Sequence, residues 1–258
     1  AISARFEETD NYNAQTVSFT LQVVEAGTQI QYSAANYKVT YDGQPYGADI
    51  PVTSPSTYTI RYSDDNGASY KLEESPEITN VGTQVIYYQI TSPGYPSATG
   101  TQTVTVEARK ITEDMISNVG GNYTYTGEQI RPVPIVRYGD ILLTSGEDYE
   151  VSYGTNLDVG NGTVTITGKG NYAGSVNKTF VISPADANYL TAQLDRYYGT
   201  YGDGNTNHAA VTVSFGGKTL TVGQDYTISC ETAAVSDSTV TFTEVGSHQI
   251  TITGKGNY

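Results

Sequence analysis

Apolar and polar residues alternate over short stretches along most of this chain. In the segment "DYEVSY" (148–153), Tyr149, Val151 and Tyr153 fall on one face. The other face is polar and consists of Asp148, Glu150 and Ser152. A period of two is typical of a β-strand with one buried face, so this pattern predicts a strand.

Two further stretches downstream show the same alternation. In "TVTITG" (163–168), Val164 and Ile166 point one way. The stretch "SVNKTFVI" (175–182) presents a second apolar series, formed by Val176, Phe180 and Ile182. Glycine, asparagine, aspartate and proline separate these short segments, and several short strands divided by such turn residues indicate a sandwich or barrel.

A sustained helical period is not found in the sequence. The segment "ITEDMISNV" (111–119) is the one candidate helix, and it is short enough to be a single turn or a strand. We therefore expect an all-β protein.

Four landmarks recur in the same order three times. A turn opens each unit ("YDGQ" 41–44, "YTGE" 125–128, "YGDG" 201–204), and a strand pattern follows it ("TYTIRY" 57–62, "DYEVSY" 148–153, "DYTISC" 225–230). A Val-Gly pair comes next (Val81-Gly82, Val159-Gly160, Val245-Gly246), and a tyrosine closes the series (Tyr95, Tyr172, Tyr258), with Tyr12 as an earlier copy. Such a repeat predicts tandem modules. In the opening turns, Gly43 and Gly127 are expected to take positive φ.

The repeat sets the expected boundaries. We predict a closing strand segment of a preceding repeat at 1–24, and β modules at 25–109, 110–184 and 185–258, the last without its closing strand. The ends fit a window cut from a longer array. The segment 1–24 is a strand without a sheet, and the last module is a sheet without its closing strand. One interpretation is that such a strand completes the sheet of a neighbouring chain. The preferred interpretation is that the fragment edges are arbitrary.

Composition excludes several classes of function. The formal net charge is −14, from 27 Asp and Glu against 13 Lys and Arg, so the chain offers no basic stripe for nucleic acid. No stretch approaches the roughly 20 apolar residues of a membrane-spanning helix, so no membrane insertion is expected. The single cysteine, Cys230, cannot form an intrachain disulfide and is expected to be a small buried hydrophobe.

The segment 123–183 closely resembles a repeat found in many tandem copies in large cell-surface proteins of gut Firmicutes and related bacteria. The matching positions are Tyr125, Gly127, Pro132, Asp148, Tyr149, Val151, Tyr153, Gly168, Gly170, Asn171, Tyr172, Phe180 and Ile182. The segments 41–53, 62–70 and 81–106 are similar to a sister repeat, and "YYGTYGDGN" (197–205) resembles the bacterial surface module labelled MBG. The resemblance implies immunoglobulin-like sandwiches, with β-grasp modules as the alternative, and an extracellular address.

The third unit departs from the pattern. Cys230 replaces the tyrosines found at 62 and 153, and "ETAAVSDSTVTF" (231–242) is inserted before the Val-Gly pair. The insertion predicts a longer loop or an extra hairpin.

Candidate chemistry is sparse. Metalloprotease, P-loop and nucleophile-elbow patterns are absent, so we expect no enzyme and no catalytic residues. His208 and His248 are interpreted as ordinary polar side chains rather than a metal pair. The loops "DGNTN" (203–207) and "SDDNGAS" (63–69) offer oxygen ligands for calcium, through Asp203, Asn205, Asn207, Asp64, Asp65 and Asn66, but both fit hairpin turns equally well. No metal or cofactor is therefore assigned, with calcium the one cation the loops suit.

Tyrosine is abundant, with 23 residues, and exposed rings could stack on sugars. The pairs Tyr87-Tyr88 and Tyr197-Tyr198 must each turn one ring outward if they lie in strands. Most tyrosines stand at repeat positions, where a structural role suffices.

We therefore expect three tandem sandwiches, about 30 Å each from strands of roughly nine residues and about 100 Å in all. The expected function is a non-catalytic spacer of a bacterial cell-surface, adhesin-like protein whose partners are neighbouring repeats. A module binding host or dietary glycan is the alternative, and an accessory region of a secreted polysaccharide-degrading enzyme is a further one. The sequence identifies no ligand-binding residue.

Overall fold

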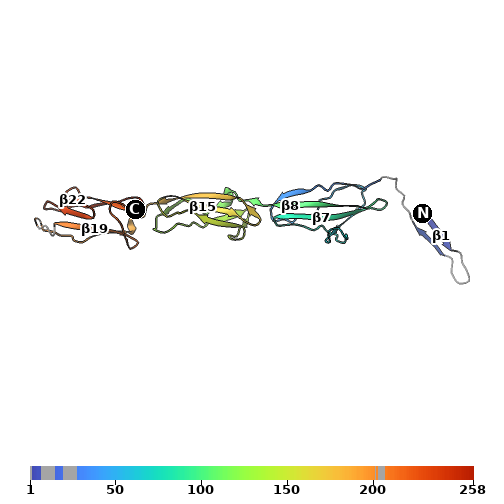
Figure 1. Cartoon of the computed structure of the whole chain (residues 1–258), viewed down its shortest axis with the longest axis horizontal. Coiled ribbons are helices and arrows are strands. Elements are labelled where there is room, and N and C mark those ends of the chain that lie inside the picture. The colour runs from blue at the N-terminus through green and yellow to red at the C-terminus, as the bar shows by residue number, and fades with distance from the viewer. Residues whose placement is uncertain (1, 7–14, 20–27, 201, 203–206) are drawn as a thin grey trace. The chain divides into compact units, whose positions relative to one another are not determined.

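The computed structural model describes residues 2–6, 15–19, 28–200, 202 and 207–258 (Figure 1). These residues form short β-strands, together with the single 3-10 turns η1 (Glu113–Met115) and η2 (Ala187–Tyr189). Contacts divide the chain into two compact units, Ala1–Arg109 with Gly170–Tyr172, and Lys110–Lys169 with Ala173–Tyr258.

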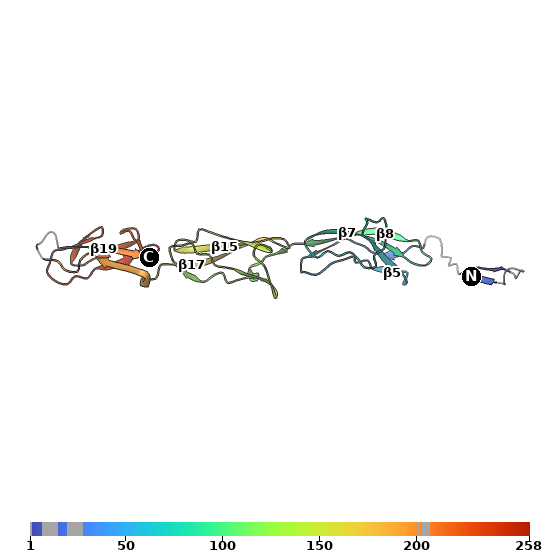
Figure 2. The same ribbon diagram turned by 90° about the horizontal axis from the view of Figure 1, so that it is seen from below.

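The first unit contains a sandwich of two sheets. Its larger sheet has the order β4-β8-β7-β6, formed by β4 (Tyr37–Thr40), β8 (Ala98–Glu107), β7 (Gly82–Thr91) and β6 (Thr59–Ser63). The smaller sheet pairs β3 (Gln31–Tyr32) with β5 (Val52–Ser54). β8 runs parallel to β4 and antiparallel to β7, so it lies between a strand from the start of the module and a strand from its middle (Figure 2).

The core of this sandwich follows the predicted alternation. Ile86, Tyr88 and Ile90 of β7 are buried together with Val104 of β8, while the residues between them are partly exposed. The opposite layer contributes Ile30 and Ile50. A separate two-stranded sheet joins β1 (Ile2–Phe6) to β2 (Gln15–Phe19).

The second unit begins with another sandwich of the same plan. Its larger sheet has the order β11-β17-β15-β14, formed by β11 (Asn122–Thr124), β17 (Ser175–Ser183), β15 (Gly160–Gly168) and β14 (Tyr149–Tyr153). Its facing sheet contains β10 (Ile116–Ser117), β12 (Ile135–Tyr138) and β13 (Ile141–Leu142). Two short strands, β9 (Arg109–Lys110) and β16 (Tyr172–Ala173), pair with each other. β17 is again parallel to the first strand of the larger sheet, β11, and antiparallel to β15.

The predicted faces in this sandwich are confirmed. Tyr149 is buried, whereas its neighbours Glu150 and Ser152 are exposed. The apolar positions of the two following strands are almost fully buried; they are Val164, Ile166, Phe180 and Ile182. The segment 111–119 contains the 3-10 turn η1 and the strand β10, which agrees with the turn-or-strand interpretation.

The remainder of the second unit holds a third set of strands. The order β18-β19-β23-β22 is formed by β18 (Leu190–Leu194), β19 (His208–Phe215), β23 (Thr239–Phe242) and β22 (Ala233–Ser236), with β20 (Lys218–Thr219) beside β19. Opposite, β21 (Tyr226–Ser229) pairs with β24 (Thr251–Gly254). The insertion at 231–242 contains the hairpin β22–β23, so of the two predicted forms, a longer loop or an extra hairpin, the structure has the hairpin.

Buried polar side chains hold irregular segments in place. Gln102 of β8 is 1% exposed, and its amide accepts the N–H of Asp49 at 2.8 Å. The same amide donates to the carbonyls of Ala35 at 2.7 Å and Asp49 at 2.8 Å. Among the described residues, every buried side-chain nitrogen or oxygen has a hydrogen-bond partner, as a stable interior requires.

The turn glycines behave as the repeat predicts. Gly43 and Gly127 both have φ of +83°, in the region where a side chain is disfavoured. The predicted module limits at 24, 109 and 184 stay a prediction, and the parts of 1–24 at 1, 7–14 and 20–24 lie outside the described residues.

Candidate functional site

The loop Gly254–Tyr258 of the second unit is tied to a turn far upstream. Asn257 Oδ1 accepts the N–H of Val159 at 2.8 Å, and Asn257 Nδ2 donates to the Asp158 carboxylate at 2.9 Å. The carbonyl of Asn257 accepts the N–H of Ala185 at 2.8 Å. One asparagine therefore joins a loop at the end of the third repeat to the Val-Gly turn of the second.

The same contacts recur in the first unit. Asn171 Oδ1 accepts the N–H of Val81 at 2.8 Å, and Asn171 Nδ2 donates to Asn80 Oδ1 at 3.0 Å. Its carbonyl accepts the N–H of Arg109 at 3.0 Å. We call each of these two sets of contacts an asparagine joint: Asn171 with Asn80 and Val81, and Asn257 with Asp158 and Val159.

Aromatic contacts accompany each joint. Tyr172 meets Tyr41 edge to face with ring centroids 5.7 Å apart, and Tyr258 meets Tyr125 in the same way at 5.5 Å. Phe215 adds a third ring in the second unit, 5.5 Å from Tyr258. Burial and a hydrogen bond with Tyr125 raise the pKa of Tyr258 to about 12, so this phenol stays neutral at physiological pH.

Three sequence landmarks therefore meet at one place. The opening-turn tyrosine, the Val-Gly pair and the closing tyrosine are far apart in sequence, and the structure brings them together at each joint. Sequence reasoning treated them as separate scaffold positions and named Asn171 only as a position of the repeat pattern, without a contact role. The signal was available, because Asn171 and Asn257 occupy the same place in two copies of "GKGNY".

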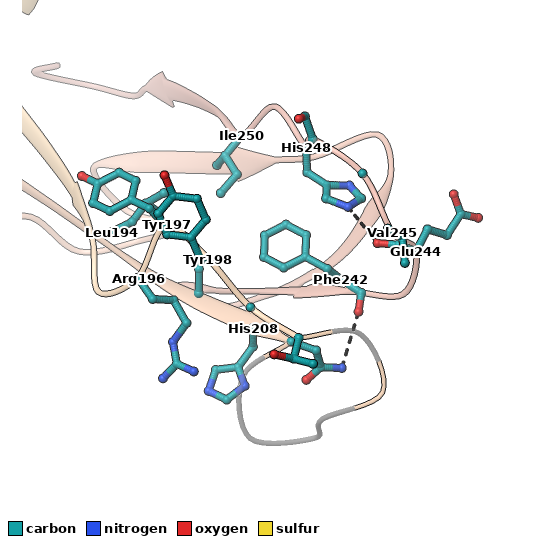
Figure 3. A pocket seen from close by; sticks show the side chains of 16 residues that line it. Leu194, Arg196, Tyr197, Tyr198, His208, Phe242, Glu244, Val245, His248 and Ile250 are labelled. Carbon is teal, nitrogen blue, oxygen red and sulfur yellow. Dashed lines mark hydrogen bonds between the residues drawn. The ribbon is translucent and has the colours of Figure 1, made fainter.

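The third repeat carries a groove of about 480 Å³ (Figure 3). Its walls are the segments 194–200, 207–209 and 242–250, and the ring of Phe242 lies between Tyr198 and His248. Tyr197 and Tyr198 are 75% and 94% exposed. The prediction of one outward ring applied to a strand, but these two residues lie outside any strand, so alternation does not apply and both rings are exposed. In Tyr87-Tyr88, which does lie in β7, Tyr88 is buried and Tyr87 is half-buried.

Both histidines line this groove. His248 Nε2 bonds to the Glu244 carbonyl at 3.0 Å, His248 Nδ1 bonds to the Thr232 hydroxyl, and the ring lies 4.8 Å from that of Phe242. Within the described ranges, no group of three or more His, Cys, Asp or Glu side chains could hold a metal ion. The interpretation of His208 and His248 as ordinary polar side chains stays a prediction.

The candidate calcium loop at 63–69 is a closed turn. Asp65 accepts the hydroxyls of Ser63 and Ser69 and the N–H of Ser69. These hydrogen bonds hold the pKa of Asp65 well below its usual range. Its carboxylate oxygens are therefore engaged by the loop's own donors. In the other loop, Asp203 and Asn205 lie outside the described residues, and Asn207 Nδ2 donates to the Phe242 carbonyl at 3.4 Å.

Cys230 lies at the edge of a core rather than inside one. It is half-buried and packs beside the cluster of Val211, Val213 and Val240. The matching tyrosines differ in burial, because Tyr62 is buried in the first core and Tyr153 is half-buried.

Taken with the sheet order, these features define the class: the chain is all-β and consists of immunoglobulin-like sandwiches. A β-grasp module needs a helix across its sheet, and the described residues contain only the two 3-10 turns. In the part of the chain that the structure describes, no helix is long and apolar enough to cross a membrane.

Comparison with known proteins adds little beyond the class. No family model matches the sequence, and no curated protein gives a significant match. Among solved structures, immunoglobulin domains 1–5 of Sidekick-1 are 11% identical with a TM-score of 0.27, covering 93% of this chain and 59% of that chain. Cadherin domains 1–4 of protocadherin gamma B7 are 11% identical with a TM-score of 0.22, covering 88% and 68%.

A third structure is SGBP-B of the Bacteroides ovatus mixed-linkage glucan utilization locus, in complex with a mixed-linkage heptasaccharide. It is 12% identical with a TM-score of 0.19, covering 86% of this chain and 61% of that chain. The chain thus spans 59% to 68% of the length of these three structures. Likenesses at this level carry no argument about function.

Proposed function

We propose that this chain is a non-catalytic spacer segment of an extracellular bacterial cell-surface protein of the adhesin type, and that it holds a distal domain away from the cell wall. The single observation that carries the proposal is the repeated asparagine joint. A spacer must pass from one module to the next in a defined way, and a bare flexible linker does not do this.

The joint supplies such a connection through short-range contacts. In the second unit, two hydrogen bonds and a tyrosine pair connect the loop of the third repeat to the second repeat. The corresponding residues make the same contacts in the first unit. Because the asparagine joint recurs with each repeat, the same contacts can connect any number of modules, as a stalk requires.

Two turn carboxylates, Asp42 and Asp195, have a lowered pKa that local hydrogen bonds explain. Hydrogen bonds within turns lower the pKa of Asp42, through the Gln44 N–H, and of Asp195, through the Ala210 N–H. Catalytic carboxylates are instead usually raised by burial in a cleft or by a nearby like charge. Both of these shifts have a local structural cause.

Small-angle scattering of the 258-residue chain tests the spacer role. A compact globule of this length has a radius of gyration of about 18 Å, whereas three modules of about 30 Å in line give roughly 30 Å. We expect the larger value. We also expect a broader distribution of maximum dimensions for the double variant Asn171→Ala and Asn257→Ala, and no change for Asn161→Ala, an exposed asparagine of β15. A value near 18 Å would sink the proposal.

Glycan binding is the second candidate, and Tyr197 and Tyr198 favour it. Two exposed rings beside a groove are the arrangement in which sugars stack on aromatic faces. A glycan array probed with the chain tests this reading, with Tyr197→Ala and Tyr198→Ala expected to lose any signal. Tyr189→Ala is the matched control, because Tyr189 is 70% exposed and does not line the groove. An accessory region of a secreted polysaccharide-degrading enzyme would also bind glycans on the array.

A further inference from the structure

Exposed aliphatic side chains gather on the facing sheet of the second sandwich. Val133 and Leu142 are 69% and 57% exposed, and Ile135 and Ile141 are exposed as well. Ile135 belongs to β12, and Ile141 and Leu142 form β13, which pairs with β12. Single exposed apolar residues are common, but a contiguous group marks a surface where another molecule binds. We call these four residues the β12–β13 patch.

The other two repeats lack the patch, so the sandwich itself does not require it. In the first repeat, aligned on the opening turns, Asp49 and Pro51 stand in place of Val133 and Ile135. In the third repeat, β19 and β20 pair in the same register as β12 and β13, and the matching residues are small or polar. These residues are Ala210, Thr212, Lys218 and Thr219. An apolar surface in only one of three repeats indicates a role other than folding.

The patch lies at the edge of its sheet. The strand order is β10-β12-β13, and among the described residues β13 pairs only with β12. Leu143 donates its N–H to the Val136 carbonyl at 3.0 Å, so the backbone at 143 faces β12. Because successive residues of a strand direct their backbone groups to opposite sides, the N–H and C=O of Leu142 point away from β12. An exposed apolar edge of this kind is a template for pairing with another chain.

The charge around the patch suits contact with a second copy of the chain. The whole chain has a formal net charge of −14, so two copies repel each other in general. The charged residues of the stretch 131–142 are Arg131, Arg137 and Asp140, and two arginines against one aspartate give this stretch a formal charge of +1. Two copies that meet at this stretch therefore avoid bringing acidic surfaces together.

We propose that the β12–β13 patch is a self-association site, and that its occupant is the same patch on a second copy of this chain. Two copies of β13 pair antiparallel about a twofold axis at Leu142, so that each Leu142 donates its N–H to the carbonyl of the other. The contact is isologous and gives a closed dimer. This inference does not depend on the spacer role.

The size of the patch sets the strength of the dimer. Four aliphatic side chains exposed by 40% to 69% present on the order of 400 Å² in one copy. Two copies therefore remove about 800 Å² of aliphatic surface from water, which is less than the roughly 1,200–2,000 Å² of a stable complex. The dimer is accordingly weak and forms at high protein concentration.

Sedimentation equilibrium of the full chain, over concentrations up to about 1 mM, tests the inference. We expect a monomer–dimer equilibrium. Leu142→Lys places a charge at the centre of the contact and should weaken the dimer at least about tenfold, because an unpaired buried charge is costly. Thr219→Lys, at the same hairpin position of the third repeat, is the matched control and should leave the dimer unchanged. Leu142 and Thr219 are both exposed, so urea denaturation should show that both variants fold as the wild type does.

Salt distinguishes a second copy from an acidic partner surface. Added sodium chloride should strengthen the dimer, because it screens the repulsion between two chains of charge −14. Association that salt weakens would show instead that Arg131 and Arg137 bind an acidic surface, and it would overturn the inference.

Hydrogen exchange locates the contact. The Leu142 amide should exchange rapidly in the monomer and become protected as the protein concentration rises, whereas the Thr219 amide should exchange rapidly throughout. Protection at Leu142 that does not depend on concentration would count against the contact. A chain that stays monomeric up to about 1 mM, or association that Leu142→Lys leaves intact, would also overturn the inference.

Discussion

Removal of the Asn257 side chain tests the asparagine joint directly. In Asn257→Ala, the Val159 N–H loses its acceptor at 2.8 Å and the Asp158 carboxylate loses a donor at 2.9 Å. Each hydrogen bond contributes about 0.5–1.5 kcal/mol net, and a partly buried N–H left unpaired adds to the loss, so we expect about 1–3 kcal/mol. Because 1.4 kcal/mol corresponds to about a factor of ten, the opening equilibrium of the joint should rise roughly 5- to 150-fold.

Native-state hydrogen exchange measured by NMR is the assay, since the exchange rate of the Val159 amide reports local opening. The rate should rise by that factor in Asn257→Ala, while the amides of β15 around Val164 keep theirs. The exposed Asn161→Ala serves as the control and should leave the Val159 rate unchanged. A change of less than about twofold at Val159, or an equal acceleration throughout the second unit, would refute the assigned role of Asn257.

Three further outcomes are expected. Gly162→Ala should destabilise the second sandwich by about 1–3 kcal/mol in urea denaturation, because the new Cβ meets the Phe180 ring. Combining it with Phe180→Val should recover part of that loss. If the double variant recovers none of it, the proposed contact is wrong. Gln102→Leu should cost about 2–5 kcal/mol, because the Asp49 N–H and two carbonyls lose buried partners, and a near-neutral result contradicts that. The folded-state pKa of Asp65 is depressed, so its ionised carboxylate stabilises the fold above the unfolded pKa of about 3.9, and this contribution is lost as pH falls toward the folded pKa. The difference in unfolding free energy between wild type and Asp65→Ala should therefore shrink between pH 4 and pH 2. A difference that stays constant over this range argues against the role of Asp65.

The alternation of single strands was sufficient to predict much of the fold. Tyr149, Val164 and Ile182 are buried as their positions in "DYEVSY", "TVTITG" and "SVNKTFVI" require, because a strand offers only two faces. The pairing of β17 with both β11 and β15 could not be predicted in this way. Which strands become neighbours depends on contacts between distant segments, and the period of one strand carries no information about them.

The candidate sites were harder to predict, for a related reason. Asn171 and Asn257 look like turn residues in the sequence, and their joint role depends on partners 90 and 98 residues upstream. Tyr197 and Tyr198 were assigned to alternating faces on the assumption of a strand, which the segment does not form. The groove arises from the arrangement of three separate segments, so its position follows only from the folded chain.

The parallel pairing of first and last strands has a mechanical consequence. β4 is the first strand of its larger sheet along the chain and β8 is the last, yet both run in the same direction side by side, as do β11 and β17. A force applied at the start of β4 and the end of β8, or at the start of β11 and the end of β17, draws the two neighbours past each other lengthwise. Their hydrogen bonds must then rupture together rather than peel open one at a time, so the shortest strands of the sheet set the tension at which the module gives way.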